Sequence, residues 1–212
     1  MMVDVTNVST RRNWLGLFGS VLAMLGVSGG VQAAAGESAG GPAKPAGGAA
    51  GQGADTLLAK EAIRELRHCY GMATDRIGTN TPEGIEEGRA IYHRIFTPDA
   101  RIGAAGYDPV TGPDAWVDLV KGALAPYEVT QHFIGTQYFR ELTLPDAAGR
   151  GGHARMASYL QAWHEEKDGR LYLFVGTYED EAVFVPGTGW RIRDMLLHLT
   201  TVDYRRVSKT RV

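Results

Sequence analysis

The sequence of 212 residues contains one cysteine, Cys69, and shows no recognisable metal-binding motif. A single cysteine cannot form a disulfide within the chain. No Cys-x-x-Cys pair occurs, and the six histidines are scattered instead of being spaced as zinc ligands are. The composition therefore excludes an internally disulfide-bonded fold, and no metal site is expected.

The sequence also lacks a basic block. It carries 22 Lys and Arg against 24 Asp and Glu, for a formal net charge of −2. Domains that bind nucleic acids typically concentrate Lys and Arg on one face, which provides the electrostatic attraction to phosphates. Nucleic acid is therefore not an expected partner.

No apolar run is long enough to span a bilayer comfortably. The longest, Trp14 to Val27, falls short of the roughly 20 residues that a membrane helix needs. It follows Arg11-Arg12 and precedes the small residues VQAAAG at 31–36, an order typical of export signals, and paired arginines indicate the twin-arginine route. We expect residues 1–35 to be a twin-arginine-type signal peptide, leaving a periplasmic or secreted protein without a stable membrane anchor. The alternative is a chance arginine pair beside an uncleaved anchor.

Residues 36–54 consist almost wholly of Gly, Ala, Pro and Ser. A segment of this composition buries too little apolar surface to offset the entropy lost on ordering, so we expect a flexible linker. Residues 55–212 then form one domain of ordinary size.

The domain begins with three helical patterns. Asp55 is a plausible N-cap for a helix that runs to about Ile77, with apolar residues spaced alternately by three and four. A second helix is predicted to start at Pro82, where the missing N–H of proline costs little, and a third covers 112–124.

Four runs rich in aromatic and β-branched residues follow, separated by turn sequences, at 128–144, 153–166, 170–185 and 189–204. Helices followed by an antiparallel meander predict an α+β fold. These strands are apolar on both faces. Since the helices can cover only one face, a homodimer or homotrimer formed through the other is predicted.

One of these predicted strands contains a histidine, His132, in the segment QHFIGTQYFRE at 131–141. Alternation with period two places His132, Ile134, Thr136 and Tyr138 on one face. A histidine in such a position is either a packed core residue or a proton carrier that faces a cavity. The strand pattern alone leaves both interpretations open.

Seven short segments, taken together, resemble the SnoaL-like branch of the nuclear transport factor 2-like superfamily, and are similar to scytalone dehydratase and the bile-acid dehydratases. They are Tyr70-x-x-Ala73-x-Asp75, IFTPDARI at 95–102, Gly-Pro-Asp at 112–114, QHFIG at 131–135, ARMASYLQAWH at 154–164, GTYED at 176–180 and GWRI at 189–192. The resemblance implies a cone of three N-terminal helices packed on a strongly bent, mainly antiparallel sheet. It also implies proton-transfer chemistry without metal or organic cofactor.

The same resemblance assigns roles to four residues. His132 is the expected base and Asp75 the carboxylate that orients it, with Tyr70 and His164 as candidate proton donors. A regular helix places Asp75 roughly 140° from Tyr70, off the apolar stripe. Asp75 therefore reaches a cavity only if the cavity touches that side of the helix, or if the helix tightens before Ile77.

The function expected from the resemblance is that of a dehydratase acting on a small apolar, cyclic or aromatic substrate. A carbon–carbon lyase that releases a small aldehyde, an isomerase and a cyclase are alternatives on the same site. The non-enzymatic alternative is an exported small-molecule-binding or dimerisation module. The candidate substrate-binding residues are Tyr92, Tyr107, Trp116, Tyr138 and Arg193.

Overall fold

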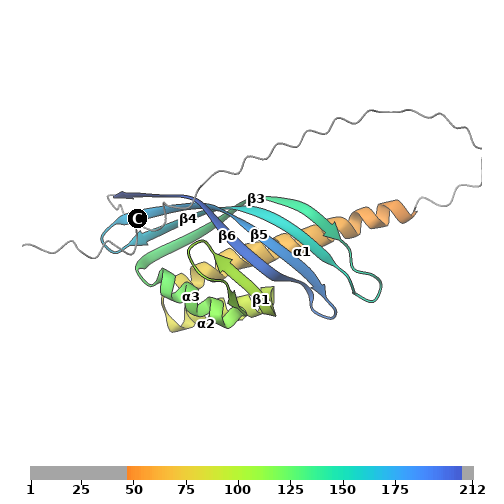
Figure 1. The fold of residues 1–212 in the computed structure, drawn as a ribbon, viewed down its shortest axis with the longest axis horizontal. Helices are drawn as coiled ribbons and strands as arrows, with labels where there is room; N and C mark the ends of the chain where they lie inside the picture. The colour runs from red at the N-terminus through yellow and green to blue at the C-terminus, as the bar shows by residue number, and fades with distance from the viewer. Residues whose placement is uncertain (1–46, 207–212) are drawn as a thin grey trace, which may run out of the picture. The chain divides into compact units, whose positions relative to one another are not determined.

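The computed structural model describes residues 47–206, which contain three helices and six strands (Figure 1). In chain order these are α1 (Gly47–Gly78), α2 (Pro82–Ile95), β1 (Phe96–Ala104), β2 (Val110–Thr111), α3 (Pro113–Leu124), β3 (Tyr127–Thr143), β4 (His153–Glu166), β5 (Arg170–Val185) and β6 (Gly189–Arg206). The predicted signal peptide and residues 36–46 of the predicted linker lie outside the described residues. Within the described residues, no helix combines the length and the apolarity that crossing a bilayer requires.

Helix α1 begins at Gly47, inside the segment predicted to be a linker. The expectation that Asp55 caps this helix is therefore wrong. The prediction that the flexible linker extends to residue 54 is wrong as well, because residues 47–54 belong to the helix. Adding a residue to an existing helix avoids the cost of nucleation, and the alanines between Gly47 and Asp55 are the best helix formers. The Thr56 hydroxyl donates to the Gln52 carbonyl at 2.8 Å, one turn earlier in this extension.

The other two helices start where the sequence predicts. The Thr81 side chain caps α2 by accepting a hydrogen bond from the Gly84 N–H at 3.1 Å, and Pro82 occupies the first turn. Helix α3 follows Gly112, whose φ of 86° is readily available only to glycine. Both starts thus follow from local sequence.

The strands form one sheet in the order β2-β1-β6-β5-β4-β3. All neighbours pair antiparallel except β1 and β6, which run parallel. The helices lie against one face of the curved sheet, and β3 forms an edge beside α1 (Figure 1). The predicted α+β cone with a mainly antiparallel sheet is confirmed.

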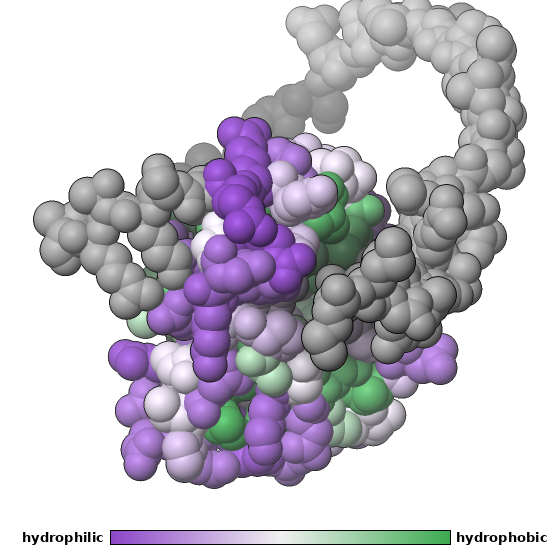
Figure 2. All heavy atoms as spheres, turned by 90° about the vertical axis from the view of Figure 1, so that its left-hand side faces the viewer, coloured by the Kyte–Doolittle hydropathy of each residue, from purple (hydrophilic) through white to green (hydrophobic). Residues whose placement is uncertain are grey.

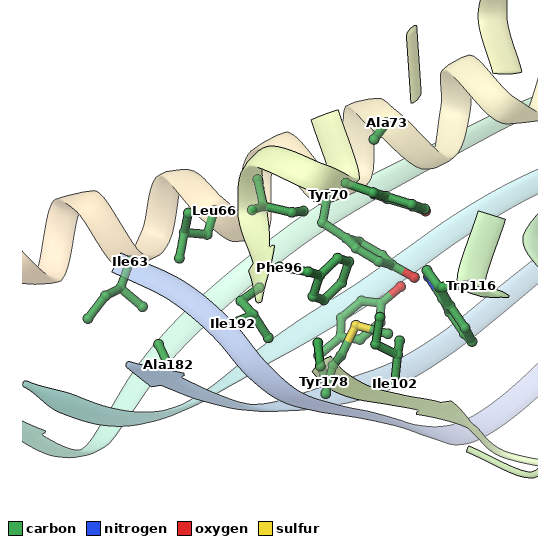
Figure 3. Close-up of a cluster of buried hydrophobic side chains, with 14 of the residues drawn as sticks. Ile63, Leu66, Tyr70, Ala73, Phe96, Ile102, Trp116, Tyr178, Ala182 and Ile192 are labelled. Atoms are coloured by element: carbon green, nitrogen blue, oxygen red, sulfur yellow. The ribbon is translucent and has the colours of Figure 1, made fainter. Parts of the chain in front are cut away.

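The core lies between the helices and the sheet. The whole predicted apolar stripe of α1 is buried in it: Ile63, Leu66, Tyr70, Ala73 and Ile77. Figure 3 shows part of this stripe above side chains from the sheet, including Tyr178 and Ile192. Burial of such a stripe supplies most of the stability of a helix in a protein.

An ion pair is buried inside this apolar cluster. The Arg67 Nε donates to Asp180 Oδ2 at 3.0 Å, and the guanidinium lies 4.5 Å from the Tyr70 ring centre and 4.0 Å from that of Tyr178. The two charged side chains are 0% and 1% exposed. Each charge is tolerated because the other compensates it and the two rings cover the cation.

Asp180→Ala is expected to lower the free energy of unfolding by about 3–5 kcal/mol, because it leaves the Arg67 guanidinium buried without its carboxylate. Urea denaturation measures the change. Glu179→Ala is the control, since it breaks the exposed Arg140–Glu179 pair (2.7 Å) and should cost less than about 1 kcal/mol. Equal losses in the two variants would contradict this account of the core.

Candidate active site

Asp75 and His132, which are distant in sequence, form a hydrogen-bonded pair. Asp75 Oδ1 lies 2.7 Å from His132 Nδ1, and Oδ2 accepts the backbone N–H of His132 at 3.0 Å. An ionised carboxylate only accepts hydrogen bonds, so Nδ1 carries the proton of the neutral ring and Nε2 carries its lone pair. The His132 side chain is 7% exposed and that of Asp75 28%. His132 is therefore oriented for proton transfer through Nε2.

Two glycines let α1 approach β3 closely enough for this contact. Gly71 and Gly78 lie four residues before and three residues after Asp75, on the same side of the helix. A Cβ atom at Gly71 would lie 3.3 Å from the carbonyl oxygen of His132, and one at Gly78 would overlap the hydroxyl of Thr130. The helix stays α-helical to Gly78, so Asp75 reaches His132 because β3 covers its side of the helix, not because the helix tightens.

Thr130 adds a third donor to the carboxylate. Its hydroxyl donates to Asp75 Oδ1 at 3.3 Å, from the same strand as His132 and two residues before it. Asp75 is thus held by two side chains and one backbone N–H. Sequence reasoning did not single out Thr130 or the two glycines; the Gly71–Asp75–Gly78 spacing was the available signal.

His164 lies beside His132 at the end of β4. The two ring centres are 5.1 Å apart, and His164 is 7% exposed. Neither ring nitrogen has a hydrogen-bond partner among the described residues. Burial, aided by the nearby His132, lowers the pKa of His164 to about 3, so its imidazole is neutral near pH 7. A buried ring with unused nitrogens is suited to hydrogen-bonding a ligand.

Tyr70 lies in the core instead of joining this group. Its ring stacks on Tyr92 at 5.4 Å and meets Phe96 and Tyr178 edge-on. Figure 3 shows its hydroxyl pointing, with that of Tyr178, toward Trp116. Burial raises the pKa of Tyr70, which makes its hydroxyl a weaker acid. The predicted convergence of imidazole, carboxylate and phenol is therefore wrong for the phenol.

Two predicted substrate-binding residues, Tyr92 and Trp116, are core residues that are 0% and 3% exposed. The Tyr92 hydroxyl lies 2.7 Å from that of Thr74 and so is already satisfied within the core. These positions stabilise the fold beneath the site, and the binding role predicted for them is not supported.

The other three predicted substrate-binding residues are exposed at the surface. Tyr138 is 65% exposed because an irregularity between Ile134 and Gln137 shifts the alternation of β3 by one residue, turning Phe139 inward in its place. The prediction that Tyr138 shares a face with His132 is wrong for this reason. Tyr107 is exposed in the turn after β1.

Arg193 lies at a second irregularity, on β6, where the β5–β6 pairing shifts between Glu181 and Ala182. Its guanidinium is half-exposed and bonded to Glu181. This pairing holds Arg193 on the sheet surface, away from His132.

The described residues also line two cavities elsewhere. One of about 120 Å³ is bordered mainly by charged side chains, among them Asp180, and one of about 320 Å³ lies between residues 55–59 of α1 and Trp190. Neither includes the His132–Asp75 pair. In the described part of the chain, no three His, Cys, Asp or Glu side chains are grouped so as to hold a metal ion.

Comparison with family models matches residues 55–195 to the SnoaL-like domain. The chain belongs to this family. Comparison with curated protein sequences found no significant match. The resemblance inferred from the sequence motifs, to the SnoaL-like branch of the nuclear transport factor 2-like superfamily, is confirmed.

Solved structures share the fold at low sequence identity. A Novosphingobium aromaticivorans protein provisionally assigned as a scytalone dehydratase is 20% identical, with a TM-score of 0.57, over 74% of this chain and 93% of that one. The type-3 hexachlorocyclohexane dehydrochlorinase LinA of Novosphingobium barchaimii is 14% identical, with a TM-score of 0.58, over 72% and 94%. At these identities the similarity establishes the fold of the SnoaL-like chain and nothing further.

Gly71→Val is expected to push β3 away from α1 and break the Asp75–His132 hydrogen bond, since a Cβ there already lies 3.3 Å from the His132 carbonyl oxygen and valine adds two methyl groups to it. Loss of the low-field Nδ1–H proton resonance of His132 measures the break, with a destabilisation of about 1–3 kcal/mol. Gly122→Val in α3 is the matched control, because nothing lies within 4 Å of its Cβ position. An unchanged resonance in Gly71→Val would refute the packing argument.

His164 should make stability depend on pH. Its folded pKa of about 3 lies below the ordinary value of 6.5, so the unfolded chain binds its proton more tightly. The contribution of His164 to the free energy of unfolding is therefore at its maximum above pH 6.5. It decreases as the pH falls from 6.5 toward 3, with a slope approaching about 1.4 kcal/mol per pH unit.

Urea denaturation between pH 7 and pH 3.5 tests this dependence. His164→Phe should flatten it, whereas His198→Phe, at a side chain 54% exposed, should leave it unchanged. If the free energy of unfolding changed equally steeply with pH in the wild type and in His164→Phe, groups other than His164 would control the pH dependence.

Proposed function

We propose that this SnoaL-like protein is a cofactor-independent lyase, specifically a dehydratase acting on a small cyclic or aromatic substrate. The observation that carries the proposal is the 2.7 Å contact between His132 Nδ1 and Asp75, which leaves Nε2 as the proton acceptor. The names of the two structural relatives, a dehydratase and a dehydrochlorinase, both denote elimination reactions and support this reaction class.

In the proposed reaction, His132 Nε2 removes a proton from a carbon next to a carbonyl or another activating group. The electrons of the broken C–H bond form a carbon–carbon double bond, and the hydroxyl on the adjacent carbon leaves with its bonding electrons. That hydroxyl takes the proton from His132, so water is released and the neutral imidazole is restored. Asp75 stabilises the imidazolium that exists between the two transfers.

The proton that reaches the leaving group comes from His132 in this scheme. Tyr70 is packed in the core, and the lowered pKa of His164 leaves it without an ionisable proton to give near pH 7. A neutral imidazole still donates a hydrogen bond through its N–H, so His164 is assigned to the substrate oxygen. With one residue as both base and acid, hydrogen and hydroxyl leave from the same face of the substrate.

The same base also suits reactions that differ in what leaves. Deprotonation of an alcohol with release of a small aldehyde, migration of a double bond and ring closure all begin with proton removal by His132. The non-enzymatic alternative is a module that binds a small molecule or only dimerises. Elimination of water is preferred because a neutral donor, His164, lies beside the base where a carbonyl or hydroxyl oxygen would sit.

Assembly through the sheet is part of the proposal. The face turned away from the helices exposes large apolar side chains: Val129, Phe133, Tyr138, Tyr159 and Trp163. Exposed apolar surfaces of this kind mark interaction sites, and a homodimer or homotrimer would cover this one. We also propose export through the twin-arginine route to the periplasm or the medium, on the basis of residues 1–35.

His132→Ala and Asp75→Asn are each expected to lower turnover by about 10²–10⁴-fold, because one removes the base and the other its orienting carboxylate. Conversion of ring compounds with a hydroxyl β to a carbonyl is followed by the ultraviolet absorbance of the new conjugated double bond. His153→Ala, at the far end of β4 from His164, serves as the control. Full activity in His132→Ala would remove the mechanism, and binding without any conversion by the wild type would favour the binding module.

A further inference from the structure

The deep part of the cone is filled by the protein's own side chains. Tyr70, Tyr92 and Tyr178 are each no more than 2% exposed, and the Arg67 guanidinium lies against two of these rings. This cluster therefore leaves no space for a ligand on its side of His132. A ligand that contacts His132 would lie on the other side, at the strand ends that surround His164.

The pairing of the strands places aromatic rings in that direction. Directly paired residues of neighbouring strands point to the same face, with Cβ atoms about 5 Å apart. Two adjacent rows therefore cross the sheet on the helix-facing side. They are His132, Ala162, Phe174 and Val202, and Thr130, His164, Tyr172 and Tyr204.

The rings of these rows contact one another, and they also contact Tyr127 at the start of β3. Phe174 and Tyr127 each lie 4.7 Å from the His164 ring, on β5 and at the start of β3. Tyr172 lies 5.9 Å from Tyr127 and 5.9 Å from Tyr204. We call Tyr127, Tyr172, Phe174 and Tyr204 the aromatic wall.

The aromatic wall begins beside the two histidines and ends at an exposed surface. Tyr127, Tyr172 and Phe174 are half-buried, whereas Tyr204 is 67% exposed and Val202, in the row beside it, 45%. Figure 2 looks at this end of the molecule and shows hydrophobic patches set among hydrophilic residues. The wall thus offers apolar surface that continues from the base to the outside.

The wall itself carries no charge. The nearest cation on β5, Arg170, is held by Glu166 at 2.6 Å and Asp168 at 2.8 Å. The second nearby cation, Arg206, pairs with Arg170 across β5 and β6 and acts on Asp168, whose pKa it helps to lower. An anionic ligand on the rings would therefore lose its hydration without gaining a counter-charge from the wall itself. An uncharged planar ring loses little on desolvation and gains offset-stacked or edge-on contacts.

We propose that the aromatic wall binds the ring of the substrate and selects uncharged planar compounds, holding the reacting carbon next to His132 and an oxygen next to His164. The proposal rests on the proposed lyase function for its substrate, but the binding surface is testable without turnover. Tyr204 is a specificity-determining residue in this arrangement, although it lies at the exposed end of the aromatic wall.

The test uses 2-naphthol as an uncharged two-ring probe and 2-naphthalenesulfonate as its charged counterpart. Affinity is measured by calorimetric titration, and the position of binding by ¹⁵N shifts of the histidine side chains. We expect 2-naphthol to bind, to shift the His132 and His164 ring signals, and to bind more tightly than the sulfonate.

Tyr204→Ala should weaken 2-naphthol binding by about two- to tenfold, since a contact between two aromatic rings adds to the affinity beyond the area that it buries. Tyr204→Phe should keep wild-type affinity, because the ring and not the hydroxyl makes the contact. Tyr159→Ala is the matched control. This tyrosine is 60% exposed, close to the 67% of Tyr204, but lies on the opposite face of the sheet.

The proposal is overturned if 2-naphthol fails to bind or if its binding leaves the two histidine signals unshifted. It is also overturned if Tyr204→Ala and Tyr159→Ala weaken 2-naphthol binding equally. His132→Ala separates this failure from failure of the lyase mechanism. Loss of turnover in His132→Ala together with unweakened probe binding in Tyr204→Ala would refute the wall alone. Unchanged turnover in His132→Ala together with weakened binding in Tyr204→Ala would refute the chemistry alone.

Discussion

The close contact between helix α1 and strand β3 is the constraint on which the candidate site depends. It exists because Gly71 and Gly78 carry no side chains where the helix meets the backbone of His132 and the side chain of Thr130. Within that contact, one carboxylate binds both the backbone and the ring of His132. A helix and an edge strand thereby become a single unit in which the proton-accepting nitrogen has a fixed direction.

Burial then gives the neighbouring groups different chemical properties. His132 has a carboxylate partner, whereas His164 has none among the described residues and is neutral because its charged form is poorly solvated. Two histidines 5.1 Å apart can therefore take different roles, one as a base and one as a neutral hydrogen-bond donor. The buried Arg67–Asp180 pair lies in the deep part of the cone, and the approach that we propose to both histidines runs along the aromatic wall.

Much of the fold was predictable because its signals are local. The apolar stripe of α1, the cap at Thr81 and the strand runs each depend on residues that are close in sequence. The errors arose where a local rule was overridden. The helix propagated backward to Gly47 through alanines read as linker, and an irregularity in β3 turned Tyr138 outward although simple alternation placed it beside His132.

The sequence by itself determined the family, the order of elements and the candidate residues His132, Asp75 and His164. Only the tertiary structure decided that Asp75 faces β3, that Tyr70 belongs to the core, and that Tyr127, Tyr172, Phe174 and Tyr204 share a wall with the histidines. The reason is that periodicity specifies which side of an element a residue occupies. Which other element lies on that side depends on strand pairing and helix packing between segments far apart in the chain.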